Sequence, residues 1–227
     1  AYGAHINDST SYQVYNKVEK TKESVAAVDA TCGQVLTWNG KVVEAYYFST
    51  SAGVTSTDEI WGSDEAAPYL RSVPCKFDEE EPWSSWIVEL PWKMLEDRIR
   101  EKGEGTVLRS VTVTRRSESG AATALEAVSD KDSCIIENEY EIRKFLAPVN
   151  CMITEKDGTE TAGGSLLPSA YFELERTQNG NLQVRGKGYG HGVGMSQTGA
   201  DKMAEQGYDY REILDYFFRN ITVENLG

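Results

Sequence analysis

Glycine occupies every second position over nine residues of this chain, at 186, 188, 190, 192 and 194. The alternation lies in the stretch GKGYGHGVGMSQTGA, which contains His191, one of two histidines in the chain. In an extended strand, side chains alternate between two faces, so one face of this segment would carry no side chains. A ligand or a second strand can then lie directly on the backbone. The sequence therefore predicts either a groove floor, with His191 and Tyr189 as polar contacts, or a tight structural crossing.

The run does not match the glycine-rich motifs that bind nucleotides or present a catalytic serine. In the three possible registers of Gly-x-Gly-x-x-Gly, the last position is held by His191, Val193 or Met195. Lys187 is followed by glycine, where a Walker loop needs a hydroxyl residue. Thr198 stands where a Gly-x-Ser-x-Gly nucleophile elbow needs its final glycine. These three kinds of site are excluded.

The charge of the chain argues against a nucleic-acid partner. Its 227 residues have a formal net charge of -13 and show no basic stripe, whereas affinity for phosphate backbones comes mainly from lysine and arginine. The longest acidic run, 78–81, is interpreted as a solvated loop. No apolar run approaches the length of a bilayer span, so we expect no membrane segment in this sequence.

Hairpin signals and separate helical patterns predict an α+β fold. Asn39-Gly40 joins two strand-like runs, 34–38 and 41–48, and this dipeptide favours a type I′ turn. Further strands are expected over 86–90, 107–114, 123–128, 170–176 and 181–186. Helices are expected over 20–31, 91–103, 138–146, 196–206 and 209–219, and a polar insertion or linker over 154–165. Strands that cluster as antiparallel hairpins, with helices kept apart from them, are typical of the α+β class.

A hydroxyl-rich stretch is the second candidate for function. Tyr47, Ser49 and Ser51 share one face if the strand continues past Phe48, although the stretch also fits an ordinary polar loop. The helix that begins at Ser196 would place its unpaired N–H groups beside His191. Because the positive end of the helix dipole disfavours a second positive charge, we expect the His191 imidazole to be neutral. The second histidine, His5, lies in a polar segment and is interpreted as solvated.

Four cysteines lack the Cys-x-x-Cys spacing of a structural zinc site. They allow either two disulfides or buried free thiols. Cys134 and Cys151 bracket the helix expected over 138–146, and we predict a disulfide between them, worth about 3 kcal/mol in the chain-entropy model. Cys32 and Cys75 form the remaining pair.

Several segments together resemble the stage II sporulation protein D family of lytic transglycosylases, which is related to the amidase enhancers of the cell wall. The resemblance rests on AVDATCGQVLTWNGKVVEAYYFSTSAGVT, EIWG, PYLRSV and GKGYGHGVGMSQTGADKMAEQGYDYREILDYFF, in this order. It implies one domain over 1–227, with lobes 1–75 plus 166–227 and 76–165 around a glycan-binding groove. The implied ligand is a peptidoglycan strand, whose sugars suit backbone, hydroxyl and imidazole contacts. We expect His191 to orient or support the reacting groups, and we expect substrate contacts from Tyr47, Ser49, Thr50, Ser51, Tyr189, Gly190, Ser196 and Gln197.

The resemblance also implies a catalytic glutamate that this sequence does not contain. In the family it lies in a Pro-x-Glu-Ala-Leu helix, which is expected to precede Ala1, as is a membrane anchor. Its carboxylic acid would protonate the glycosidic oxygen between N-acetylmuramic acid and N-acetylglucosamine, and then deprotonate the 6-hydroxyl to close a 1,6-anhydro ring. The 227 residues alone are therefore expected to be inactive.

Cofactors, partners and location follow from the same resemblance. Some members bind zinc through a Cys and a His-Cys pair before Gln-Val-Tyr, but Ser11 and Tyr12 precede Gln13 here, so no cofactor is expected. The expected partners are denuded glycan strands and a cell-wall amidase of the engulfment machinery, and the expected location is extracytoplasmic, in a spore-forming bacterium. The alternative function is a non-catalytic module that binds wall glycan or enhances an amidase.

Overall fold

A computed structural model describes residues 19–226, so the interpretations of His5, Ser11 and Tyr12 concern residues outside the described part. The chain divides into two compact units. The smaller unit contains the described residues up to Leu36 together with those from Val223 onward, and the larger unit contains Thr37–Thr222. The lobe boundaries expected near 75 and 165 both fall inside the larger unit, and the predicted groove between two lobes stays a prediction.

The smaller unit contains helix α1 (Lys22–Ala30), close to the predicted bounds. Thr21 caps this helix, because its side chain accepts the Ser24 N–H at 3.1 Å while the Ser24 hydroxyl bonds back to Thr21. Strand β1 (Gln34–Trp38) pairs with strand β13 (Thr222–Asn225), which the sequence patterns did not predict.

The predicted hairpin is confirmed but shorter than expected. Asn39 and Gly40 have φ angles of 49° and 72°, as a type I′ turn requires, and join β1 to β2 (Lys41–Val42). The run expected to continue to residue 48 is interrupted. Its last two residues form β3 (Tyr47–Phe48), which pairs in parallel with β12 (Met195–Ser196).

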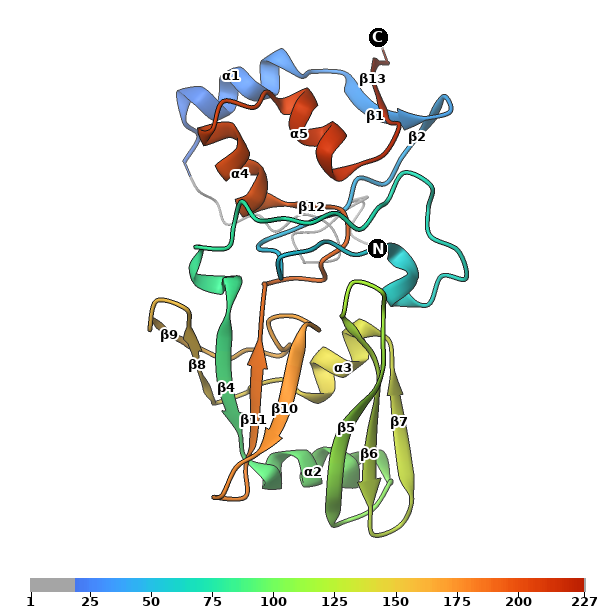
Figure 1. The fold of residues 1–227 in the computed structure, drawn as a ribbon, viewed down its shortest axis with the longest axis vertical. Coiled ribbons are helices and arrows are strands. Elements are labelled where there is room, and N and C mark those ends of the chain that lie inside the picture. The colour runs from blue at the N-terminus through green and yellow to red at the C-terminus, as the bar shows by residue number, and fades with distance from the viewer. Residues whose placement is uncertain (1–18, 227) are drawn as a thin grey trace, which may run out of the picture. The chain divides into compact units, whose positions relative to one another are not determined.

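A five-stranded antiparallel sheet forms one layer of the larger unit (Figure 1). Its order is β10 (Phe172–Arg176), β11 (Leu182–Gly186), β4 (Trp86–Leu90), β8 (Met152–Glu155) and β9 (Glu160–Ala162). Residues 154–165 were expected to be a polar insertion or linker. The linker interpretation is wrong, because this segment holds most of the β8–β9 hairpin. Asp157-Gly158 provides its turn, with Gly158 at φ +87°.

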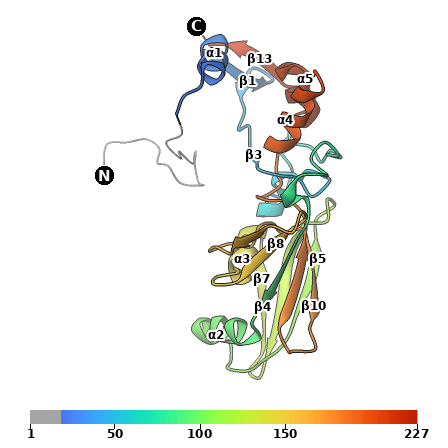
Figure 2. The same cartoon turned by 90° about the vertical axis from the view of Figure 1, so that its left-hand side faces the viewer.

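A second sheet and two helices complete the main core. Strands β5 (Leu108–Arg116), β6 (Ala122–Ser129) and β7 (Ser133–Glu137) form an antiparallel meander. Helices α2 (Trp92–Lys102) and α3 (Glu139–Phe145) lie on the same side of the strands (Figure 2). One buried apolar cluster joins both sheets and both helices, and each fully buried aliphatic or aromatic side chain in it contributes about 1.5–3 kcal/mol.

Helices α4 (Gln197–Glu205) and α5 (Tyr210–Phe217) follow the glycine run, as predicted. Ser196 and Asp209 cap them through hydrogen bonds from backbone N–H groups. Two short 3-10 helices, η1 (Asp58–Trp61) and η2 (Pro82–Ser84), lie in the connections before β4. The α+β class is confirmed. Within residues 19–226, no helix combines the length and apolar character needed to cross a bilayer.

The predicted Cys134–Cys151 disulfide is wrong, and so is the Cys32–Cys75 pairing. All four cysteines are free thiols. Cys134 on β7 and Cys151 before β8 pack separately against the main core, where burial raises the pKa of each thiol. Cys75 is fully buried, and burial, followed by the charge of Asp78, raises the pKa of its thiol to about 12. The core holds these thiols without a crosslink.

Candidate functional site

The glycine run is not an extended strand, so the first premise of the groove-floor interpretation is wrong. Gly188, Gly190, Gly192 and Gly194 all have positive φ angles, of 74°, 114°, 84° and 79°. Only glycine adopts this conformation without strain, which explains the residue type at each position. The segment bends repeatedly, and its side chains do not simply alternate between two faces.

The open side of these glycines is filled by the chain itself. A Cβ added at Gly194 would lie 2.1 Å from the Tyr46 carbonyl oxygen, and one at Gly190 would lie 2.7 Å from the Phe48 Cβ. A Cβ at Gly188 would lie 2.8 Å from the Thr50 carbonyl oxygen. These three glycines therefore allow close approach of two protein segments, and the structural crossing is the arrangement observed. The backbone at Gly190 is not a free floor for a glycan.

Backbone hydrogen bonds hold the crossing together. Thr50 and Tyr189 exchange two N–H···O bonds of 3.0 and 2.8 Å. The Ser56 N–H donates to the Gly192 carbonyl at 2.6 Å, and the Met195 N–H donates to the Tyr46 carbonyl at 3.0 Å. These bonds join the hydroxyl-rich loop and the glycine run into one hydrogen-bonded frame.

Asp78 is the polar centre of this frame, and the solvated-loop interpretation is wrong for it. Its side chain is fully buried. The carboxylate accepts the Ser51 N–H at 2.8 Å, the Ser51 hydroxyl at 2.7 Å and the Ser196 hydroxyl at 2.6 Å. The Thr198 hydroxyl donates to it at 3.3 Å. A single carboxylate thus ties the loop to the start of α4, a role that the acidic run 78–81 gave no reason to expect.

The predicted contact residues divide into buried and accessible groups. Thr50, Ser51 and Ser196 expose 2%, 1% and 0% of their surface, so their hydroxyls bind within the protein and are not available for direct contact with a glycan. Tyr189 exposes 42% of its surface and packs edge-on against Trp83, with ring centroids 4.6 Å apart.

The remaining predicted residues reach solvent. Gln197 is exposed at the first turn of α4, while Tyr47 and Ser49 are half-buried. The Thr198 N–H donates to the Ser49 carbonyl at 3.0 Å, which places Gln197 next to the hydroxyl loop. These three residues and Tyr189 form the accessible part of the candidate site.

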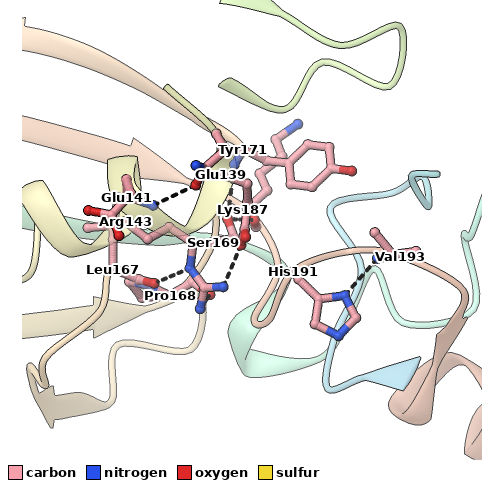
Figure 3. A network of polar contacts seen from close by, with 11 residues as sticks. Glu139, Glu141, Arg143, Leu167, Pro168, Ser169, Tyr171, Lys187, His191 and Val193 are labelled. Carbon is pink, nitrogen blue, oxygen red and sulfur yellow. Dashed lines mark hydrogen bonds and ion pairs between the residues drawn. The ribbon is translucent and has the colours of Figure 1, made fainter. Parts of the chain in front are cut away.

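His191 lies among aromatic rings, and its imidazole is hydrogen-bonded to the backbone at Val193 (Figure 3). Its ring contacts Trp61 and Phe48, with centroid distances of 5.2 and 5.7 Å. Nδ1 accepts the Val193 N–H at 3.0 Å, and the ring also hydrogen-bonds to the Tyr47 backbone. Burial, followed by the charge of Arg143, lowers the pKa of His191 to about 4. The imidazole is neutral at pH 7, as the sequence predicted, although burial is the main cause and not the dipole of α4.

A buried ion pair supports the same segment (Figure 3). Arg143 on α3 pairs with Glu139 at 2.5 Å and donates to the carbonyl oxygens of Leu167 and Pro168 at 2.8 and 3.2 Å. Pro168 also accepts the Gly190 N–H at 2.8 Å. The guanidinium therefore fixes the turn on which the glycine run rests. Sequence patterns gave no signal for this pair beyond its i, i+4 spacing on a helix.

Two carboxylates near the frame are engaged inside the protein, and a third is exposed. Asp78 and Glu139 are buried and engaged by internal partners. Glu59 is exposed and accepts the Thr57 hydroxyl at 2.7 Å. In the same range, no group of three or more histidine, cysteine or acidic side chains is arranged to hold a metal ion.

A comparison with family models identifies the family of this chain. A family model described as a domain of unknown function (DUF8618) matches residues 74–194, more than half of the chain. The chain belongs to this family. The match covers Asp78, the Arg143–Glu139 pair and most of the glycine run.

Curated relatives are similar to this DUF8618 chain over nearly its whole length. Stage II sporulation protein D of Bacillus amyloliquefaciens is 29% identical over 97% of the chain, which spans 60% of that protein. The amidase enhancer of Bacillus subtilis is 23% identical over 97% of the chain, which spans 35% of it. An uncharacterized protein of Brachyspira hyodysenteriae is 31% identical over 96% of the chain, which spans 53% of it. The resemblance to the stage II sporulation protein D family is confirmed, and the chain spans little more than half the length of the first relatives.

Proposed function

We propose that this DUF8618 chain binds the glycan strands of peptidoglycan and forms part of a lytic transglycosylase of the cell wall. The parent protein would be anchored in a membrane of a spore-forming bacterium and act outside the cytoplasm during engulfment. It would cleave denuded strands between N-acetylmuramic acid and N-acetylglucosamine and leave a 1,6-anhydro end. The relatives named stage II sporulation protein D, which match along almost the whole chain, support this assignment.

The observation that carries the proposal is a set of accessible polar and aromatic groups on a frame held by backbone hydrogen bonds and Asp78. Tyr189 and Trp83 offer aromatic surface, while Ser49 and Gln197 offer hydrogen-bonding groups beside them. Sugars present both apolar C–H faces and hydroxyls, so they suit such a mixture. The backbone crossing and Asp78 hold these groups in place before a ligand arrives, which reduces the entropic cost of binding.

His191 supports this site without supplying its acid. A group with a pKa of about 4 is unprotonated at pH 7, so it cannot donate a proton to the glycosidic oxygen. Because both ring nitrogens have internal partners, we assign His191 a positioning role: it fixes the frame between Val193 and Tyr47.

The proposed acid and base is a glutamate of the parent protein outside these 227 residues. Its carboxyl group would first protonate the leaving oxygen and then remove the proton from the 6-hydroxyl of N-acetylmuramic acid, whose oxygen closes the ring. No second carboxylate is needed, because the sugar supplies the nucleophile.

A second function is favoured by the amidase enhancer among the relatives. On this alternative, the same surface binds wall glycan, and the parent protein recruits or stimulates an amidase without cleaving the strand. Both functions require glycan binding by the accessible residues, and they differ in whether the parent protein releases 1,6-anhydro products.

Binding of denuded glycan strands by the purified chain tests the shared part of the proposal. We expect Tyr189→Ala to weaken binding about tenfold, since truncation of a central aromatic contact typically costs more than 1 kcal/mol. Tyr210→Ala is the matched control, because Tyr210 is 43% exposed against 42% for Tyr189 and lies on α5. If both variants bind glycan with the affinity of the unmodified 227-residue chain, the surface around Tyr189 is not the binding site.

A further inference from the structure

A pocket of about 580 Å³ lies beside the candidate site, and the proposed function does not use it. It is bounded by η1, by the end of β5 and by the end of β7, all within the larger unit. Its lining residues include Glu59, Trp61, Arg115, Arg116, Glu137 and Asn138. The volume is large enough for a small ligand.

Two irregularities in the backbone converge on this pocket. Arg115 and Arg116 are consecutive residues of β5, and regular alternation would direct them to opposite faces of the sheet. The β5–β6 register shifts between Val113 and Arg115 and again between Arg115 and Arg116, and atoms of both arginines line the pocket. The Arg115 guanidinium lies toward Glu137 at the pocket, whereas that of Arg116 binds the Phe172 carbonyl and Glu173. Bulges of this kind redirect side chains and are common next to binding sites.

Asn138 supplies the second irregularity. Its φ angle is 61°, which is uncommon for a residue other than glycine, and it follows Glu137 at the end of β7. Its side-chain oxygen accepts the Glu141 N–H at 3.0 Å. This bond fixes the amide at the pocket wall.

The chemistry of the lining selects the class of ligand. Arg115 pairs with Glu137 at 3.2 Å, and both side chains remain more than half exposed. Residues of both charges line the pocket, so a simple anion or cation would meet repulsion from one of the two sets. A neutral ligand rich in hydroxyls avoids this repulsion and can accept from the guanidinium while donating to the carboxylates.

Trp61 connects the pocket to the candidate site. This residue lines the pocket, and its ring contacts that of His191, with centroids 5.2 Å apart at an interplanar angle of 63°. A saccharide chain bound at the accessible residues beside His191 could therefore continue past the indole ring.

We propose that this pocket is a second saccharide-binding subsite, which holds the continuation of a glycan strand bound near Tyr189. The inference rests on the proposed function, since it assigns an additional part of the same ligand to a separate place. Affinity then depends on the number of sugar units, because short oligosaccharides fill one region and longer ones fill both.

The test compares the affinities of N-acetylglucosamine oligomers of two to six units for the full chain, measured by calorimetry. Arg115→Ala/Glu137→Ala removes both members of the exposed pair, so neither charge is left without its partner. Lys93→Ala/Asp97→Ala on α2 is the control, because it removes another exposed pair, with a separation of 2.8 Å, at residues outside the pocket lining. It also frees the exposed Arg100, which contacts Asp97. Both variants should keep the melting temperature of the parent chain within a few degrees, since exposed pairs contribute little to stability.

We expect the unmodified 227-residue chain and the control to bind the hexamer about tenfold more tightly than the dimer. The Arg115→Ala/Glu137→Ala variant should lose this gain and bind the dimer with unchanged affinity. Unchanged length dependence in that variant would overturn the subsite and leave the proposed function standing. Failure of the parent chain to bind any oligomer or denuded strand would overturn both. Binding of a free stem peptide that the pocket variant abolishes, with glycan binding intact, would assign the pocket to a peptide and overturn the saccharide subsite.

Discussion

Removal of the Asp78 carboxylate should destabilise the frame more than any other single change in the acidic run. The carboxylate is fully buried and accepts three hydrogen bonds of 2.6–2.8 Å from Ser51 and Ser196. A hydrogen bond to a charged group contributes about 1.5–3 kcal/mol. The two hydroxyls have second acceptors, the carbonyl oxygens of Cys75 and Ser49 at 3.3 and 3.2 Å, which offset part of the loss. We therefore expect Asp78→Ala to lower the free energy of unfolding by about 3–5 kcal/mol.

Urea unfolding monitored by tryptophan fluorescence measures this loss, and two further variants serve as comparisons. Asp78→Asn keeps the shape and one acceptor oxygen, so its expected loss is about 1–2 kcal/mol. Glu79→Ala changes the exposed neighbour and should stay within about 0.5 kcal/mol of the parent chain. If Asp78→Ala and Glu79→Ala unfold at the same urea concentration, Asp78 does not hold the frame and the reasoning is refuted.

Three other predictions address the histidine, the glycines and the thiols. The pKa of His191 is about 4 in the folded chain, against an ordinary value of 6.5. Between these pH values the unfolded chain binds more protons than the folded chain. The free energy of unfolding should therefore fall by about 2–3 kcal/mol as the pH drops from 6.5 to 4. His191→Gln should remove that part of the pH dependence in urea unfolding, and an unchanged pH profile would contradict it. Gly194→Ala should lower the free energy of unfolding by well over 2 kcal/mol, because its Cβ would lie 2.1 Å from the Tyr46 carbonyl oxygen. Gly53→Ala is the control: its φ is +90° but the space around it is open, so the loss should be only about 1–2 kcal/mol of backbone strain. Alkylation of the native chain followed by mass spectrometry should label Cys32 first and Cys75 last, with no disulfide-linked peptides; rapid labelling of Cys75 would show that the core around it opens.

The sequence predicted those helices and hairpins whose ends are marked by turn or capping residues. Asn39-Gly40 located the first hairpin, and Ser196 and Asp209 located the starts of the last two helices, because turn and cap preferences depend on neighbouring residues alone. The same chemistry marked the β8–β9 hairpin through Asp157-Gly158, but the polar composition of 154–165 favoured a linker. The edge position of β9 explains that composition, since an edge strand tolerates polar residues.

Long-range contacts account for what the sequence did not predict in the candidate site. Five alternating glycines fit both a ligand groove and a close crossing, and only the approach of Tyr46 and Phe48 distinguishes the two. Asp78 lies 118 positions from Ser196 along the chain, so no local pattern connects them. The neutral state of His191 was predicted correctly, but from a helix dipole, whereas burial is its main cause. Residue types identified the candidate region, and tertiary packing decided which of its side chains are accessible.

The products released from denuded glycan strands test the proposed activity most directly. Mass spectrometry would compare the soluble products formed by the parent protein with those formed by the 227-residue chain. The proposal predicts fragments with 1,6-anhydro-N-acetylmuramic acid ends from the parent protein, none from the chain alone, and glycan binding by both. Fragments with ordinary reducing ends, no cleavage by the parent protein, or 1,6-anhydro products from the chain alone would contradict it.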